Sequence, residues 1–166
     1  CLEKIDESSE HLLSLINDVL DLTRVESGKV KYNPGPTDLK SITDSSLDIT
    51  KGFLTNRDIN FKIQREEAKI PNVLEDPARL SEVLVNILSN AVKFTPDGGT
   101  ITFEAQCQEK GGDGYINMRY RISDTGIGMS EEFTKEVFEE FAQEDSDVRT
   151  QYHRVGLGMA IVKKYI

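Results

Sequence analysis

The chain has 166 residues, 37% of them apolar, and it carries a formal net charge of −9 at pH 7. This size and apolar content predict one sizeable core with an appended arm, and the acidic balance argues against nucleic-acid binding and against adhesion to anionic lipid. Cys1 and Cys107 are too few and too far apart for a disulfide framework or a metal cluster, and no apolar run approaches the roughly 18 residues of a membrane span. We therefore expect a soluble chain from a reducing compartment, without a signal peptide.

Residues 2–26 are predicted to form one long helix, because apolar residues recur at helical spacing over about half of its circumference. These are Leu2, Ile5, Leu12, Leu13, Leu15, Ile16, Val19, Leu20 and Leu22. So wide an apolar face fits a helix in a four-helix bundle, although a helix packed on its own domain is the alternative. Ser27-Gly28 should end it, and the break at Gly35-Pro36 then separates an arm, residues 1–32, from a domain, residues 37–166.

Next in the chain, Thr37 or Asp38 can cap a second helix running to about Asn56. Its apolar positions include Leu39, Ile42, Ile49 and Phe53. Residues 59–63 then alternate between apolar and polar side chains, which is the period of a strand, and residues 72–75 can add a short strand.

A third helix is predicted to begin at Asp76-Pro77, an N-cap carboxylate followed by a proline at the first helical position, and to end near Lys93. Its buried stripe is Leu80, Val83, Leu84, Ile87, Leu88 and Ala91. Asn86, Asn90 and Lys93 line up on another face. Amide oxygens can ligate Mg²⁺ and a lysine can pair with phosphates, so this face predicts a metal and phosphate site, with a merely solvated helix face as the alternative.

Two runs of alternating residues, 101–107 and 116–122, predict a hairpin with one buried face, joined by the glycine-rich residues 111–114. Asp124, Gly126 and Gly128 follow at the exit of the second strand. Glycines at this spacing let a backbone approach a ligand, and a carboxylate there can accept a hydrogen bond from an adenine amino group; a plain tight turn is the alternative.

Ser130 should open a further helix. Residues 138–154 contain Phe138 and Phe141 and otherwise indicate a mobile loop, after which Gly156-Leu157-Gly158 opens a last helix whose N-terminal amides can face an anion. No GxxxxGK[ST] loop occurs, so a bound nucleotide would be held without one.

Four segments resemble the ATP-binding motifs of sensor histidine kinases and occur in the order that the family has. They are NILSNAVKFT for the N box, DTGIGM for the first glycine box, FEEF for the phenylalanine box and GLGMAIV for the second glycine box. DPARLSEVL and PDGGTI also match, and HLLSLINDVLDLTRVESGKV resembles the second helix of the family's dimerisation and phosphotransfer hairpin. The resemblance implies a two-layer α/β sandwich of the Bergerat type, in which helices cover a mixed sheet, with an N-terminal bundle helix and ATP between the central helix and a lid.

Carried over residue by residue, the resemblance makes Asn90 the Mg²⁺ ligand, with Asn86 and Lys93 supporting metal and phosphates. Asp124 would accept a hydrogen bond from the adenine amino group, with Gly126 and Gly128 shaping that wall of the site. The remaining implied ATP-binding residues are Phe138 and Phe141, which would anchor the lid, and Gly156, Leu157 and Gly158, which would close over the phosphates. The implied partners are a second copy, bound through the N-terminal helix, and a response regulator; the implied location is the cytoplasm, with a parent protein that could be anchored in the inner membrane.

Some positions depart from the family pattern. Neither His11-Leu12-Leu13 nor His153-Arg154-Val155 resembles the family's phosphoacceptor motif, and Arg154-Val155 stands where the family has Gly-Thr. The chain also ends at Ile166, where the family continues, so we expect a fragment whose acceptor histidine lies elsewhere. Two alternatives remain open: a degenerate kinase domain used for protein contact, and an ATPase of the gyrase or MutL type. The second is disfavoured because Asn86 occupies the place of the glutamate that activates water there.

Overall fold

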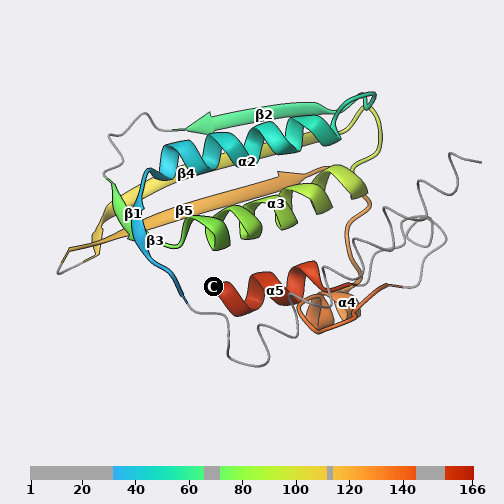
Figure 1. The fold of residues 1–166 in the computed structure, drawn as a ribbon. Helices are drawn as coiled ribbons and strands as arrows, with labels where there is room; N and C mark the ends of the chain where they lie inside the picture. Colours follow the sequence, from blue (N-terminus) through green and yellow to red (C-terminus); the bar gives the residue numbers. More distant parts are fainter. Residues whose placement is uncertain (1–31, 66–71, 112–113, 145–155) are drawn as a thin grey trace, which may run out of the picture. The chain divides into compact units, whose positions relative to one another are not determined.

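The computed structural model describes residues 32–65, 72–111, 114–144 and 156–166 (Figure 1). The predicted bundle helix, both histidines and Arg154-Val155 lie outside these residues. The described residues fall into two compact units, one of Asn33–Gly128 and one that includes Met129–Ile166. None of the described helices combines the length and the apolarity needed to cross a membrane.

A three-stranded mixed sheet forms the centre of the first unit. Its order is β2 (Asn60–Arg65), β4 (Thr100–Gly111) and β5 (Tyr115–Asp124), with β2 parallel and β5 antiparallel to β4. The predicted alternation is confirmed: Ile101, Phe103 and Ala105 are buried in β4, and the hairpin register places Phe103 opposite Ile122. The sheet therefore has one apolar face and one polar face.

Helices α2 (Leu39–Phe53) and α3 (Pro77–Phe94) lie side by side on the apolar face of this sheet (Figure 1). Both contribute to the core beneath them, which consists of Leu47 from α2, Leu84 and Leu88 from α3, and Phe103 and Ala105 from β4. The expected two-layer α/β sandwich with a mixed sheet is confirmed.

The second helix differs from its prediction in two respects. It ends at Phe53 and not near Asn56, because Asn56 has a φ of 67° and the chain turns there. Its buried face is also more polar than expected: Ile49 and Phe53 are 47% and 44% exposed, whereas three hydroxyl residues are buried. These are Thr43, Ser46 and Thr50, and each hydroxyl donates to the carbonyl four residues earlier.

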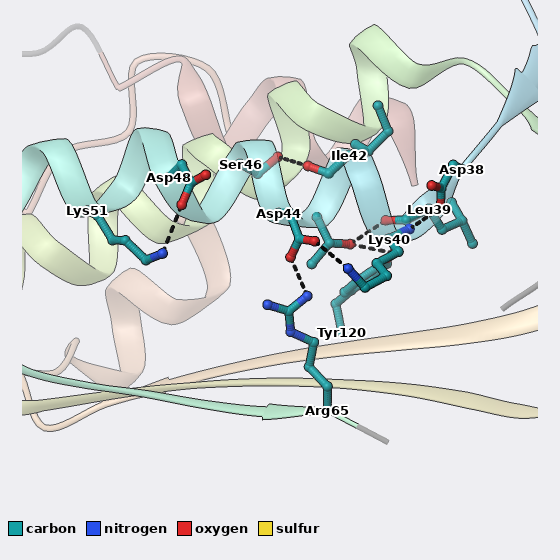
Figure 2. Close-up of polar contacts among 11 residues, drawn as sticks. Asp38, Leu39, Lys40, Ile42, Asp44, Ser46, Asp48, Lys51, Arg65 and Tyr120 are labelled. Carbon is teal, nitrogen blue, oxygen red and sulfur yellow. Dashed lines mark hydrogen bonds and ion pairs between the residues drawn. The ribbon is translucent and has the colours of Figure 1, made fainter. Parts of the chain in front are cut away.

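Figure 2 shows polar contacts within α2 and between α2 and the sheet. The small side chains allow α2 to approach α3, where the hydroxyl oxygens of Ser46 and Ser81 are 3.3 Å apart. On the sheet side, Arg65 at the end of β2 pairs with Asp44 of α2, which also pairs with Lys40. Hydroxyl groups that satisfy themselves within their own helix can be buried at low cost, which periodicity of apolar residues does not detect.

The break predicted at Gly35-Pro36 is instead a short strand. β1 (Gly35–Thr37) pairs antiparallel with β3 (Val73–Glu75), and Pro36 lies opposite Leu74. A proline has no amide hydrogen, but an edge strand of a two-stranded sheet tolerates it because one side of each strand needs no partner. The predicted short strand near residues 72–75 is confirmed.

Candidate nucleotide-binding site

Helix α3 begins and ends close to the predicted residues. Asp76 is the N-cap, and its carboxylate accepts from the backbone amides of Ala78 and Arg79 at 3.2 and 3.4 Å. The carboxylate also accepts from the amide of Asn33 at 3.0 Å, and this bond, with those from the helix, lowers the pKa of Asp76 below its ordinary value against the opposing effect of burial. The first turn of α3 is thus held to the segment that enters the unit.

The apolar stripe of α3 is confirmed in its centre and shifted at its ends. Val83, Leu84, Leu88 and Ala91 are buried as predicted, and Val92 is buried in addition. Leu80 and Ile87 are only half-buried. Asn86, Asn90 and Lys93 occupy a half-buried face of the same helix, at the spacing that aligns side chains along one side.

Two side-chain amides on this face have no hydrogen-bond partner in the part of the chain that the structure describes. Within the described ranges of the chain, neither Asn86 nor Asn90 makes a side-chain hydrogen bond, whereas the ammonium of Lys93 lies 4.6 Å from the centre of the Phe94 ring. Partly buried amide oxygens that accept no hydrogen bond from the described residues fit the coordination of a hard cation, together with water and phosphate oxygens. No cluster of three His, Cys, Asp or Glu side chains suited to a metal occurs in the part of the chain that is described.

The turn at residues 124–128 lies at the exit of β5. One carboxylate oxygen of Asp124 accepts from the amide of Gly126 at 2.8 Å, which fixes the turn and leaves the second oxygen exposed. Gly128 has a φ of 69°, a conformation that favours glycine. A backbone bent in this way exposes the carboxylate at the mouth of the turn.

The turn packs directly on the end of α3. The amide of Ile127 donates to the carbonyl of Phe94 at 3.2 Å. A Cβ atom on Gly126 would lie 2.6 Å from that same carbonyl oxygen and 2.6 Å from the Asp124 carboxylate, so no side chain fits there. Lys93 and the 124–128 turn are therefore neighbours within one unit, which sequence spacing alone could not reveal.

Two threonines that the sequence interpretation passed over complete this junction. Thr95, the C-cap of α3, is 1% exposed and its hydroxyl donates to the Ala91 carbonyl at 2.7 Å. Thr125 exchanges two hydrogen bonds with Thr100: its hydroxyl accepts at 2.9 Å and its amide donates at 3.0 Å. The strand β4 and the turn are thus joined immediately beside the end of α3.

The second unit contains the other predicted site residues. α4 (Glu131–Glu136) begins at the Ser130 N-cap as expected, and Phe138 and Phe141 follow with 40% and 55% of their surface exposed. α5 (Gly158–Tyr165) begins after Leu157, which is 1% exposed and thus serves as a packing residue.

Backbone packing and ion pairs bring this helix next to the phenylalanine segment. Gly156 has a φ of 76°, and a Cβ atom there would lie 2.6 Å from the Ala142 carbonyl oxygen. Lys163 and Lys164 pair with Glu139 and Glu140 at 2.9 and 2.7 Å. FEEF and GLGMAIV, which are separated in sequence, therefore meet within this unit.

Residues 75–166 match the family model described as histidine kinase-, DNA gyrase B-, and HSP90-like ATPase. The chain belongs to this ATPase family. Among its relatives is the circadian input-output histidine kinase CikA of Synechococcus elongatus, 36% identical over 99% of this chain and 21% of CikA. The autoinducer 2 sensor kinase/phosphatase LuxQ of Vibrio harveyi is 32% identical over 99% of this chain and 19% of LuxQ.

A solved structure agrees with this assignment to the ATPase family. Full-length ShkA in complex with AMPPNP is 30% identical, with a TM-score of 0.78 over 96% of this chain and 31% of ShkA. The chain thus spans about a fifth of the curated relatives it matches, 21% and 19% of their lengths. The resemblance to the ATP-binding catalytic part of sensor histidine kinases is confirmed, and ATP is the nucleotide that the family name implies.

Proposed function

We propose that this chain binds Mg-ATP and, within its parent protein, transfers the γ-phosphoryl group to a histidine side chain. The observation that supports this most directly is that α3 and the 124–128 turn lie next to each other in the first unit. α3 carries Lys93 and two side-chain amides, Asn86 and Asn90, which have no hydrogen-bond partner among the described residues. α3 and the adjacent turn together present groups that can bind a cation, phosphates and a purine amino group.

Each residue has a proposed role. The Asn90 amide oxygen would ligate Mg²⁺, with Asn86 beside it, and the Lys93 ammonium would pair with phosphate oxygens. The bound cation would neutralise charge that develops on the phosphates during transfer. The free oxygen of Asp124 would accept from the adenine amino group, which orients the nucleotide. Catalysis would rest mainly on positioning and on electrostatic stabilisation.

Phosphoryl transfer is preferred to hydrolysis for a specific reason. Asn86 lies on the same face of α3 as Asn90, at the place where a gyrase-type ATPase needs a carboxylate. An amide cannot take a proton from water, so attack by water on the γ-phosphate is not assisted there.

The roles of Phe138, Phe141, Gly156 and Gly158 toward the nucleotide are also proposals. The side chain of Leu157 is buried, so only its backbone is proposed to contact the nucleotide. The proposed partners are a second copy, bound through the N-terminal helix, and a response regulator, as expected for the relatives' class of protein. We further propose a cytoplasmic location for this part of the parent protein.

Calorimetric titration of the chain with ATP, with and without Mg²⁺, tests the proposal. Tight binding that requires Mg²⁺ is expected. Binding that is undetectable under both conditions would favour a degenerate domain used for protein contact. Steady release of phosphate from ATP in the absence of any histidine acceptor would instead favour a gyrase-type ATPase.

A further inference from the structure

Arg57, in the loop between α2 and β2, has no role in the nucleotide site as described above. Its guanidinium nevertheless contacts the chain just beyond α3 at several points. One nitrogen donates to the Thr95 carbonyl at 2.8 Å, a second reaches the Val92 carbonyl at 3.5 Å, and the third donates to the Asp97 carboxylate at 2.8 Å. A cation at this position also complements the negative end of the helix dipole.

The backbone next to Arg57 also forms hydrogen bonds with the loop that follows α3. The amide of Gly98 donates to the Asp58 carbonyl, and the amide of Asn60 donates to the Gly99 carbonyl at 2.9 Å. The arginine therefore anchors one end of a continuous pairing between residues 57–60 and residues 95–99. This pairing leads directly into the parallel ladder of β2 and β4.

Arg57 contacts the loop of residues 95–99, and this loop lies where α3 meets the 124–128 turn. A Cβ atom on Gly99 would lie 2.4 Å from the Thr95 side chain and 3.1 Å from the Thr125 hydroxyl, so these segments touch. Lys93 lies two residues before Thr95, and the Phe94 carbonyl between them accepts from Ile127. Displacement of Thr95 would move the end of α3 relative to the turn.

We infer that Arg57 is a positioning residue for nucleotide binding, which holds the C-terminal end of α3 so that Asn90 and Lys93 keep their spacing from the 124–128 turn. This inference rests on the proposed function. A ligand that spans both places, such as Mg-ATP, depends on the spacing, whereas adenosine reaches only the turn and depends on it less.

The hydrogen bonds from Arg57 to the backbone carbonyls contribute more to this positioning than its ion pair with Asp97 does. The side chain of Arg57 is 26% exposed, but that of Asp97 is 61% exposed, so solvent screens the pair. The hydrogen bond from Arg57 lowers the pKa of Asp97 below its ordinary value. Lysine cannot replace arginine fully, because a single ammonium does not offer the planar fork that reaches several acceptors at once.

The test is calorimetric titration of the whole chain with Mg-ATP and with adenosine, for wild type and four variants, at a temperature where each is folded by circular dichroism. Arg57→Met should weaken Mg-ATP binding about tenfold and adenosine binding about twofold or less. Arg57→Lys should fall between Arg57→Met and wild type. Asp97→Asn should stay within about twofold of wild type, because the exposed pair contributes little.

Arg65→Met is the matched control, because Arg65 pairs with Asp44 of α2 (Figure 2) and lies at the opposite end of β2 from the loop that contains Arg57. It should lower the midpoint of thermal unfolding without changing Mg-ATP affinity. If Arg57→Met binds like wild type, or if Arg65→Met weakens binding equally, the inference is wrong; if Arg57→Met does not fold, Arg57→Lys decides on the same criteria. If the wild-type protein itself does not bind Mg-ATP, the proposed function is wrong. Failure of the proposed function can thus be told apart from failure of the inference about Arg57.

Discussion

The side-chain amide of Asn90 is half-buried and, among the described residues, has no hydrogen-bond partner. Its replacement should therefore cost the fold little. Asn90→Ala is expected to leave stability unchanged or to raise it by a few tenths of a kcal/mol, since alanine is the better helix former. The same variant should weaken Mg-dependent ATP binding by about tenfold or more, because a proposed metal ligand is lost.

Calorimetry with and without Mg²⁺ checks this prediction, and Asn117→Ala, which removes an exposed amide from β5, is the matched control. Unchanged Mg-ATP affinity in a folded Asn90→Ala protein would refute the metal assignment.

Gly126 shows how a single residue joins two parts of the site. A methyl group there would meet the Phe94 carbonyl and the Asp124 carboxylate, each at 2.6 Å. Gly126→Ala should therefore push the turn away from α3, destabilise the protein by about 1–3 kcal/mol and weaken ATP binding. Urea unfolding and titration with Mg-ATP measure both effects.

Gly52→Ala is expected to have the opposite effect on stability. A Cβ atom on Gly52, in the last turn of α2, would contact nothing within 4 Å. Alanine should raise stability by up to about 1 kcal/mol through helix propensity alone. Equal effects of the two substitutions would show that close approach at Gly126 does not matter.

The N-terminus of α3 illustrates how a helix is tied to the chain around it. Asp76 is 6% exposed, and its two oxygens accept from three backbone amides, those of Asn33, Ala78 and Arg79. Asp76→Asn can still cap the helix, but it turns one acceptor into a donor facing the Asn33 amide. We expect a loss of about 1–3 kcal/mol at pH 7.

The pH dependence of this loss follows from the lowered pKa of Asp76, whose first cause is the hydrogen bond from Asn33. A depressed folded-state pKa gives stability that is fully present above the unfolded value, about 3.9, and is lost as the pH falls through the folded value. The difference between wild type and Asp76→Asn, measured by urea unfolding from pH 7 to pH 3, should shrink below about pH 4. A difference that stays constant over this range would contradict the assignment.

For the molecule as a whole, the proposed chemistry needs a histidine that this sequence does not present in an acceptor motif. The chain has two histidines, His11 and His153, and neither is followed by a sequence like that of the family's acceptor. We expect no transfer of labelled phosphate from ATP to the chain itself. Acid-labile, base-stable label that disappears in His11→Ala or His153→Ala would contradict this expectation.

The sequence alone determined the elements whose causes are local. The N-cap at Asp76, the proline after it and the helical period predicted α3 closely, because caps and amphipathic spacing act within a few residues. The alternation in β4 and β5 predicted the hairpin for the same reason, and the ordered motifs predicted the family, which the comparisons confirm.

Only the tertiary structure decided which distant segments meet. Three contacts join residues far apart in sequence: the antiparallel pairing of β1 with β3, the contact of Gly126 with Phe94, and the hydrogen bond from Arg57 to Thr95. The burial of the polar face of α2 was likewise decided by packing, although its hydroxyls donate within the helix. Such contacts form where packed layers bring backbone carbonyls and small side chains together. A local sequence pattern does not reveal which distant segments pack against each other. The candidate residues on α3 were therefore predictable, whereas the loop that positions them was not.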